Sequence, residues 1–451
     1  MKNIFNIREN IGEIGSFALP IFIEQLCIAS MSIISAMMVS HISSAAIAGV
    51  SLVEAINVLI QQIFLSLEVG ATVVVAQYCG RKDHKSAGEA IVQAMLTSIC
   101  LASVISALML IFPNFMLGMV FGDAEAAVYE AGRIYFMFAV ISFPFLSIYS
   151  IAVGSIRGSG NPRQSLIGVL VTNCSFVVLG FFFIKILNMG VYGAGMALLI
   201  ARILGAATGL ILLKKGNSAP EIARWIPKKI RWDIQKSILT IGIPSCIEAM
   251  IFSAGRLVTQ TFVVPYGTQA IAVNAIANSI AAFYNIPGST ASTMSIPVVG
   301  KYIGMKDKKR AIDMSRIILC LAMLVMAILS ILFILFIHPI TGLFTSDPVI
   351  ITAMIPIITL NFIIAPFTWP PSFVTPAVLR SSGAVKYTTT VAIFSMVLFR
   401  MTIGYILAVN LGLGVIGVWI GMWADWIVRT VLFGMRYLKG KWAERQLIKD
   451  D

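Results

Sequence analysis

Charged side chains are scarce in this chain: Asp, Glu, Lys and Arg make up only 12% of its 451 residues, whereas 58% are hydrophobic. The mean hydropathy is +0.92. A soluble protein of this length needs a charged surface, and this composition does not provide one. Apolar runs of about 18 residues or more recur along the whole sequence, which is the length that a membrane-spanning helix requires. We therefore expect an all-α integral membrane protein.

Residue types that usually build metal and catalytic sites are also rare. The three histidines, His41, His84 and His338, fall near the ends of apolar runs. The six cysteines are scattered without the short spacings of a zinc site, so we expect neither a metal nor a disulfide. No Gly-x-x-x-x-Gly-Lys-Ser/Thr motif for binding ATP occurs. These absences argue against an enzyme and against a bound cofactor.

The apolar runs predict twelve membrane-spanning helices. Their expected ranges are 14–39, 46–78, 90–112, 131–154, 163–187, 190–213, 238–263, 270–300, 312–337, 350–378, 385–410 and 414–437. Six spans form an N-terminal lobe, residues 1–213, and six form a C-terminal lobe, residues 238–451. Between them, residues 214–237 are rich in Lys and Arg and read as a cytoplasmic linker. Four prolines crowd the tenth span, which we expect to be the most interrupted helix.

The positive charge is distributed unevenly among the connections. The net charge is +13, and most Lys and Arg residues follow even-numbered spans or lie at the termini. Arg81, Lys82 and Lys85 after the second span are an example. Basic residues accumulate on the cytoplasmic side of membrane proteins. We therefore place both termini in the cytoplasm, with the chain in the cell membrane, and we interpret the charge as an orientation signal rather than a nucleic-acid site.

An internal repeat relates the two halves. Pro20 and Glu24 recur as Pro244 and Glu248, a shift of 224 residues. Two further motifs keep nearly the same register: Gly80-Arg81-Lys82-Asp83 corresponds to Gly304-Met305-Lys306-Asp307, and Arg157-Gly158-Ser159-Gly160 corresponds, with a shift of 223, to Arg380-Ser381-Ser382-Gly383. Because each half has an even number of spans, both begin on the same side of the membrane. They are therefore predicted to be parallel repeats related by an axis along the membrane normal.

The repeated Pro and Glu pair is the first candidate site. Residues four apart share one helix face, and the proline frees the backbone carbonyl four residues before it. A carboxylate in the hydrocarbon region costs at least ~2.5 kcal/mol, so it is rarely present without a function. We predict that Glu24 and Glu248 are ion-coupling acids, which hold a proton or bind Na⁺. The alternative is a structural acid that is hydrogen-bonded to the neighbouring backbone.

A row of polar residues marks the second span. Glu54, Asn57, Gln61 and Glu68 are spaced by 3, 4 and 7 residues, so they share one helix face. The shift of 224 gives a milder version in the eighth span, with Asn278 and Asn285. We expect the following residues to line a water-filled substrate cavity: Asn57, Gln61, Glu68, Asn278 and Asn285. The alternative is hydrogen bonding between helices.

Two further charged residues are candidates for the cavity. Asp425 lies four residues before Arg429, which also fits an ordinary salt bridge within one helix. Arg256 lies eight residues after Glu248 and shares its helix face roughly. We expect that Arg256 could pair with Glu248 or with another acid and then disfavour cationic cargo.

Three stretches give the chain a resemblance to the multidrug and toxic compound extrusion (MATE) family of the MOP superfamily. They are Leu-Pro-Ile-Phe-Ile-Glu-Gln at 19–25, Gly-Ala-Thr-Val-Val-Val-Ala-Gln-Tyr-Cys-Gly at 70–80 and Ile-Arg-Gly-Ser-Gly-Asn-Pro at 156–162. The resemblance implies two six-helix lobes around a V-shaped cavity. It also implies secondary active efflux of cationic or amphipathic compounds, in exchange for inward H⁺ or Na⁺, by alternating access. The expected partners are the lipid bilayer and such small molecules, and we expect a monomer.

The chain departs from the family pattern at two places. Many relatives carry an aspartate late in the first span, where this chain has Ser35, and a glutamate about two turns past the proline of the seventh span, where it has Phe252. The coupling ion and the coupling lobe therefore stay open. A lipid-linked oligosaccharide flippase of related architecture is the rival function, because its diphosphate would need a cationic cavity. Arg202, Arg256 and Arg400 would serve that rival if they face the central cleft rather than pairing elsewhere.

Overall fold

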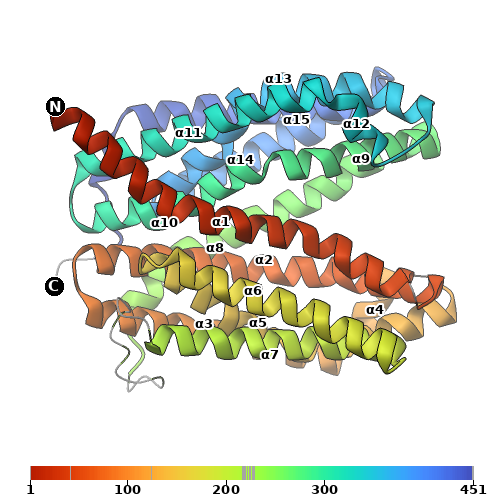
Figure 1. The fold of residues 1–451 in the computed structure, drawn as a ribbon, viewed down its shortest axis with the longest axis horizontal. Coiled ribbons are helices and arrows are strands. Elements are labelled where there is room, and N and C mark those ends of the chain that lie inside the picture. The colour runs from red at the N-terminus through yellow and green to blue at the C-terminus, as the bar shows by residue number, and fades with distance from the viewer. Residues whose placement is uncertain are drawn as a thin grey trace. The chain divides into compact units, whose positions relative to one another are not determined.

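The structure is a computed structural model that describes residues 2–40, 42–122, 124–215, 220, 222, 225 and 229–448. These residues form helices and connections, without strands (Figure 1). In the first half the helices are α1 (Lys2–Ser40), α2 (Ser44–Gly80), α3 (His84–Ile111), α4 (Pro113–Phe121), α5 (Ala126–Gly158), α6 (Pro162–Phe181), η1 (Phe182–Ile186) and α7 (Gly190–Lys215). In the second half they are α8 (Trp232–Thr261), η2 (Val264–Tyr266), α9 (Gly267–Tyr284), α10 (Ile286–Gly304), α11 (Lys308–Leu335), α12 (Ile337–Gly342), α13 (Pro348–Ser381), α14 (Val385–Ser395), η3 (Met396–Ile403), η4 (Ile406–Asn410), α15 (Gly414–Leu438) and η5 (Lys441–Glu444).

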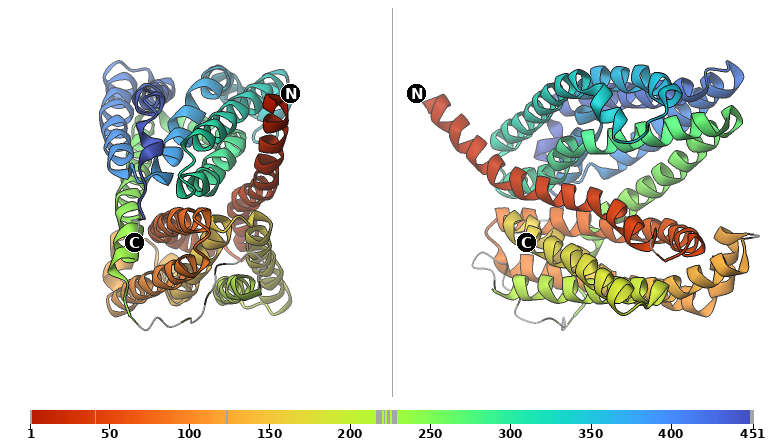
Figure 2. Two further views of the ribbon diagram at one scale, coloured as in Figure 1. Left: turned by 90° about the vertical axis from the view of Figure 1, so that its left-hand side faces the viewer. Right: turned by 45° about the vertical axis from the view of Figure 1, so that its right-hand side comes forward.

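Two compact units make up the chain. The N-terminal unit is Ile23–Cys246, and the C-terminal unit combines Met1–Phe22 with Ile247–Asp451. Within each unit the long helices run alongside one another (Figure 2). The divisions fall inside α1 and α8, two residues after Pro20 and Pro244. The first part of α1 therefore belongs to the C-terminal unit, and the first part of α8 belongs to the N-terminal unit.

Eleven stretches of the described residues are long and apolar enough to cross a membrane. One of them, Trp232–Tyr284, is 53 residues long and contains both α8 and α9. Between these helices lie the short 3₁₀-helix η2 and Gly267, whose φ of 86° reverses the chain direction. This stretch therefore supplies two of the twelve expected passes. The expected span 270–300 is divided at Asn285, since α10 begins there with Pro287 in its first turn, where a proline fits.

The backbone repeats in detail what the sequence repeats. Lys82 and Lys306 both adopt φ = 61°, a left-handed conformation that is uncommon for residues other than glycine. The next residue in each half caps a helix: Asp83 accepts a hydrogen bond from the Ser86 amide at 2.9 Å, and Asp307 accepts one from the Arg310 amide at 3.0 Å. The internal repeat therefore extends to two matched turns.

The prediction that the proline-rich tenth span is the most interrupted helix was wrong. Helix α13 continues from Pro348 to Ser381 with five internal prolines. Neighbouring helices can satisfy the carbonyls that prolines free. Pro366 frees the carbonyl of Phe362, and this carbonyl accepts a hydrogen bond of 2.6 Å from the Ser330 hydroxyl. The described helices are interrupted elsewhere: the eighth expected span is divided at Asn285, and in the eleventh the π-helices η3 and η4 follow α14.

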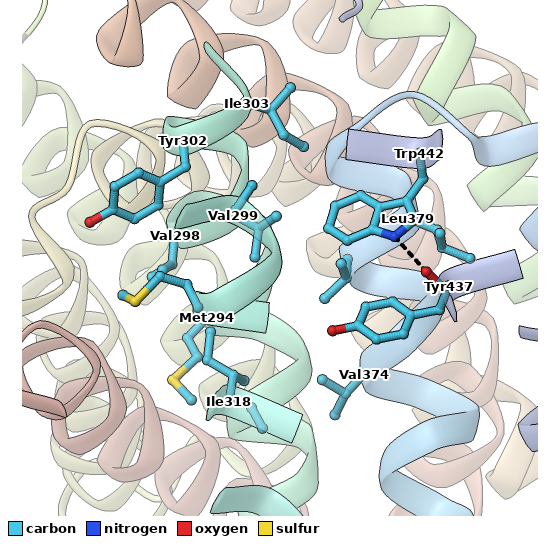
Figure 3. Close-up of a cluster of buried hydrophobic side chains, with 14 of the residues drawn as sticks. Met294, Val298, Val299, Tyr302, Ile303, Ile318, Val374, Leu379, Tyr437 and Trp442 are labelled. Carbon is cyan, nitrogen blue, oxygen red and sulfur yellow. Dashed lines mark hydrogen bonds between the residues drawn. The ribbon is translucent and has the colours of Figure 1, made fainter. Parts of the chain in front are cut away.

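Apolar side chains fill the interior of each unit. In the N-terminal unit the buried cluster includes Phe64, Phe136 and Phe143. One buried cluster of the C-terminal unit joins Met294 and Val298 of α10 to Ile318, Val374 and Tyr437 from other helices (Figure 3).

The first part of α1 is fixed in the C-terminal unit by the same cluster. Its residues Ile14, Phe17 and Ile21 are buried members of that cluster. The Glu13 carboxylate adds polar contacts to α10, because it lies 2.8 Å from Lys301 Nζ and accepts a hydrogen bond of 2.5 Å from the Tyr302 hydroxyl. The segment that precedes Pro20 is therefore an integral part of this unit.

Candidate functional site

In the N-terminal unit, two carboxylates share one arginine. Arg157, near the end of α5, places Nη2 at 3.1 Å from Glu24 Oε1 and at 2.8 Å from Glu68 Oε1. Glu24 is 2% exposed, Glu68 6% and Arg157 9%. The Ser165 hydroxyl lies 3.5 Å from the other oxygen of Glu24. When both acids are ionised, this buried group carries a net charge of −1.

A glycine makes room for this arrangement. A Cβ atom on Gly154 of α5 would lie 2.3 Å from Glu68 Cγ and 2.7 Å from Thr72 Oγ1. Such distances are far shorter than van der Waals contact, so only glycine lets the Glu68 side chain pass α5. With a shift of 223, the corresponding residue in the other half is Ala377.

In the C-terminal unit, the corresponding acid has an arginine to itself. Arg380 Nη2 lies 2.5 Å from Glu248 Oε1, and the Thr389 hydroxyl donates to Glu248 Oε2 at 3.3 Å. Ser292 stands where the repeat places Glu68, and its hydroxyl donates to the Phe373 carbonyl at 3.0 Å. The Glu248 and Arg380 pair is therefore neutral, with side chains that are 15% and 18% exposed.

Both acids are predictable from the sequence, but their arginine partners are not. Of the partners that the sequence left open for Arg256, Glu248 is instead paired with Arg380. Arg157 and Arg380 are themselves related by the shift of 223, so the repeat contained the signal that identifies them. Sequence alone could not show that each arginine lies beside the Pro and Glu motif, because the two are more than a hundred residues apart.

The polar row on α2 divides between two arginines. Asn57, 1% exposed, donates to Glu54 at 3.0 Å and accepts from Arg202 Nη2 at 2.9 Å. Arg202, from α7, also donates to the Ser142 hydroxyl at 2.6 Å. Asn57 and Arg202 therefore join three helices by hydrogen bonds, and Glu68 lies with Arg157. Gln61 is half-buried between these two groups along α2.

A small pocket lies in the C-terminal unit, with a volume of about 20 Å³, enough for a water-sized group. Its lining residues are Arg256, Thr259, Gln260, Asn274, Asn278, Arg400, Val418, Trp419 and Met422. The Asn278 amide donates to Asn274 Oδ1 at 3.1 Å, and the Trp419 indole donates to the same oxygen at 3.1 Å. Arg256 and Asn278 therefore line the same small pocket.

Asn285 and Asp425 do not line this pocket. Asn285 lies at the break between α9 and α10. Asp425 is 0% exposed, and its Oδ1 accepts a hydrogen bond of 2.7 Å from Arg429 Nε, which is the salt bridge within one helix that the sequence left open. Arg429 also donates to the Ser395 hydroxyl at 2.8 Å. Asp425 is therefore committed to this network.

The two departures from the family pattern have different surroundings. Ser35 is half-buried on α1. The Phe252 ring lies under two guanidinium groups, with its centroid 5.2 Å from Arg400 Cζ and 5.5 Å from Arg429 Cζ. An aromatic face attracts cations but carries no counter-charge. Among the described residues, no three His, Cys, Asp or Glu side chains form a group that could hold a metal ion.

Comparison with known proteins places these sites in a family. The family model described as MatE matches residues 20–186 and 244–406, and both matches begin at a proline of the repeat. A probable multidrug resistance protein NorM from Thermotoga maritima is 26% identical over 448 residues, which cover 97% of this chain and 94% of that protein. The uncharacterized transporter YisQ from Bacillus subtilis is 26% identical over 439 residues, which cover 95% of this chain and 94% of that protein.

Solved structures agree with the fold. A multidrug resistance MATE family transporter of the MOP superfamily, in an outward-facing conformation, aligns with a TM-score of 0.87 at 20% identity over 95% of this chain and 96% of that one. A MOP superfamily transporter from Pyrococcus furiosus, described as having a binding pocket of reverse polarity, aligns with a TM-score of 0.85 at 21% identity over the same shares. Members of the matched family are transporters, not enzymes. The chain belongs to the MATE family of transporters.

Proposed function

We propose that this chain is a multidrug efflux antiporter, which exports cationic or amphipathic compounds in exchange for H⁺ or Na⁺ by alternating access. The family match and the relatives named as multidrug resistance proteins support this proposal. The proposal includes a monomer in the cell membrane with both termini in the cytoplasm, and no cofactor apart from the coupling ion.

The observation that carries the proposal is the sharing of Arg157 by Glu24 and Glu68. Binding of one H⁺ or Na⁺ changes this group from a net charge of −1 to neutral. Carboxylate and hydroxyl oxygens are also the ligands that hard cations prefer. A buried charge is costly in a membrane, so the occupied and empty forms differ in the free energy of closing the site away from water. This difference can link ion binding to a conformational change.

Glu248 is the second coupling acid of the proposal, with a different requirement. Its charge is already matched by Arg380, so a coupling cation must first displace that arginine. The two acids are therefore expected to respond differently to the same substitution.

The test is ethidium efflux from proteoliposomes under an imposed gradient of H⁺ or of Na⁺. We expect Glu24→Gln and Glu68→Gln to abolish gradient-driven efflux, because each removes the excess negative charge, while ethidium binding persists. Glu248→Gln is the matched comparison, since it makes the same change at the equivalent repeat position. Efflux at the parent rate in Glu24→Gln, Glu68→Gln and the double variant would contradict the coupling site.

A further inference from the structure

Arg400 is a buried arginine with unused hydrogen-bond donors. Only 6% of the Arg400 surface is exposed. The nearest carboxylate oxygen, Asp425 Oδ2, lies 3.9 Å from Arg400 Nη1, beyond hydrogen-bond distance, while Asp425 bonds to Arg429. Within the described part of the chain, no acceptor bonds to the Arg400 guanidinium. A guanidinium has five N–H donors, and Arg400 lines the small pocket, where these donors are available to a ligand.

The surroundings of Arg400 carry an excess of positive charge. Arg429 and Arg400 both stack over Phe252, and Arg400 lines the small pocket together with Arg256. Arg400 and Arg429 lie beside a single carboxylate, Asp425, so these three side chains carry a net charge of +1, and Arg256 adds a further positive charge at the pocket. The Phe252 ring orients the two guanidinium groups without neutralising them. Asp425 therefore offsets only part of the positive charge around this pocket.

The rest of the pocket is both polar and apolar. Gln260 and Asn278 contribute amide groups, and Trp419, Val418 and Met422 contribute an apolar wall. A charged group, a few polar groups and an apolar wall are the usual composition of a site for an amphiphilic small molecule. Arg256 and Gln260 at this pocket are exposed, so a head group larger than a water molecule would extend from the enclosed space past these two side chains.

The backbone that carries Arg400 breaks the internal repeat. Arg400 lies in the π-helix η3, Met396–Ile403, and the corresponding residues 172–179 of the N-terminal unit are ordinary α-helix within α6. By contrast, the π-helix η4 has a counterpart in η1, at a shift of 224. π-helical turns are rare and occur frequently at functional sites. The irregularity specific to one half therefore coincides with the arginine whose guanidinium has no hydrogen-bond acceptor among the described residues.

We propose that this pocket binds an oxyanion, the carboxylate or phosphate group of an amphiphile, held between the Arg400 and Arg256 guanidinium groups. The oxyanion accepts charge-assisted hydrogen bonds from Arg400, and its charge offsets the excess around Asp425. The site lies in a different unit from Glu24 and Glu68. It is independent of the coupling mechanism proposed above.

The test uses purified protein and 11-(dansylamino)undecanoic acid, whose fluorescence reports binding, with its methyl ester as the uncharged control. We expect the acid to bind and the ester to bind at least tenfold more weakly, because hydrogen bonds to charged groups are lost. Arg400→Gln and Arg256→Gln should each weaken binding of the acid by about tenfold. Arg316→Gln, at an exposed arginine on α11 of the same unit, should leave it unchanged.

The exposed position of Arg256 keeps the test independent of folding, because Arg256→Gln removes no buried group. Equal affinity of acid and ester, or unchanged affinity for the acid in both Arg400→Gln and Arg256→Gln, would overturn the proposal. Vesicles of phosphatidylglycerol, compared with phosphatidylcholine, identify the source of the oxyanion. Displacement of the dansyl acid by phosphatidylglycerol assigns the site to a lipid phosphate, and persistent binding assigns it to a carboxylate amphiphile.

Discussion

Arg157 and Arg380 are repeat counterparts, yet one holds two carboxylates and the other holds one. The difference comes from Glu68, which has Ser292 as its counterpart. A buried arginine that stabilises two acids cannot be removed without leaving both uncompensated, which makes Arg157 the residue on which the N-terminal site depends.

Arg157→Gln should therefore destabilise the protein by roughly 3–5 kcal/mol, the cost of removing one partner from a buried ion pair. Thermal unfolding in detergent, followed by size-exclusion chromatography, measures the change. Adding Glu68→Gln to this variant should restore part of the stability, because one of the two buried, uncompensated charges is then gone. A double variant no more stable than Arg157→Gln would speak against charge as the cause.

Gly154→Ala should disturb the same site without altering any charge. The added Cβ would approach Glu68 Cγ to 2.3 Å, so Glu68 must move away from Arg157. We expect a loss of about 1–3 kcal/mol, typical of overpacking, together with impaired gradient-driven efflux. The control is Gly118→Ala, since a Cβ on Gly118 would meet no atom within 4 Å. Equal stability and efflux in both variants would show that the close packing is unimportant.

At the scale of elements, the turn between α2 and α3 depends on Asp83. Burial alone would raise the pKa of Asp83, but hydrogen bonds from Ser86 and the charges of Arg231 and Arg81 outweigh it and hold that pKa below its usual value. A carboxyl group with a depressed folded-state pKa stabilises the protein above its unfolded-state pKa of about 3.9. This stabilisation is lost as the pH falls through the folded-state value.

We therefore expect Asp83→Ala to lose the helix cap, worth about 0.5–2 kcal/mol, at pH 7. The loss relative to the parent should shrink as the pH falls below about 3.9, because the stabilisation from the ionised Asp83 is lost as the pH falls through its lowered folded-state pKa. Asp83→Asn keeps a capping oxygen and should lose less at pH 7. The measurement is the unfolding temperature of each protein across this pH range. If the difference between the parent and Asp83→Ala does not vary with pH, the ionised carboxylate of Asp83 does not contribute to stability.

The sequence predicted where the long helices lie but not where they break. Apolar runs identify spans because membrane helices need continuous apolar length. The continuity of α13 depends on contacts such as the Ser330 hydroxyl on the Phe362 carbonyl, which no local pattern reveals. Likewise, Glu24 and Glu248 were evident from the repeat, whereas the pairing of Arg157 with Glu68 depends on three helices meeting. Local composition therefore predicts the helices, whereas the polar contacts between helices can be identified only from the three-dimensional structure.

For the whole molecule, the number of passes sets the topology. If Trp232–Tyr284 crosses the membrane twice, Lys82 and Lys306 lie on the same, cytoplasmic side, and Ser346 lies outside. In a cysteine-free background, Lys82→Cys and Lys306→Cys should resist a membrane-impermeant maleimide in intact cells, and Ser346→Cys should react. Opposite labelling of Lys82→Cys and Lys306→Cys would instead indicate a single crossing.

Helices α1 and α8 each pass from one compact unit to the other just beyond a proline. The first segment of each half of the polypeptide therefore belongs to the unit that is formed mainly by the other half. A fragment that ends before α8 would leave its own unit without Ile238, whose backbone packs against Gly70. We expect that neither half folds when it is expressed alone, and that the two halves fold when they are expressed together. If an ancestral protein of half this length exchanged its first segment in the same way, it would have formed a domain-swapped dimer.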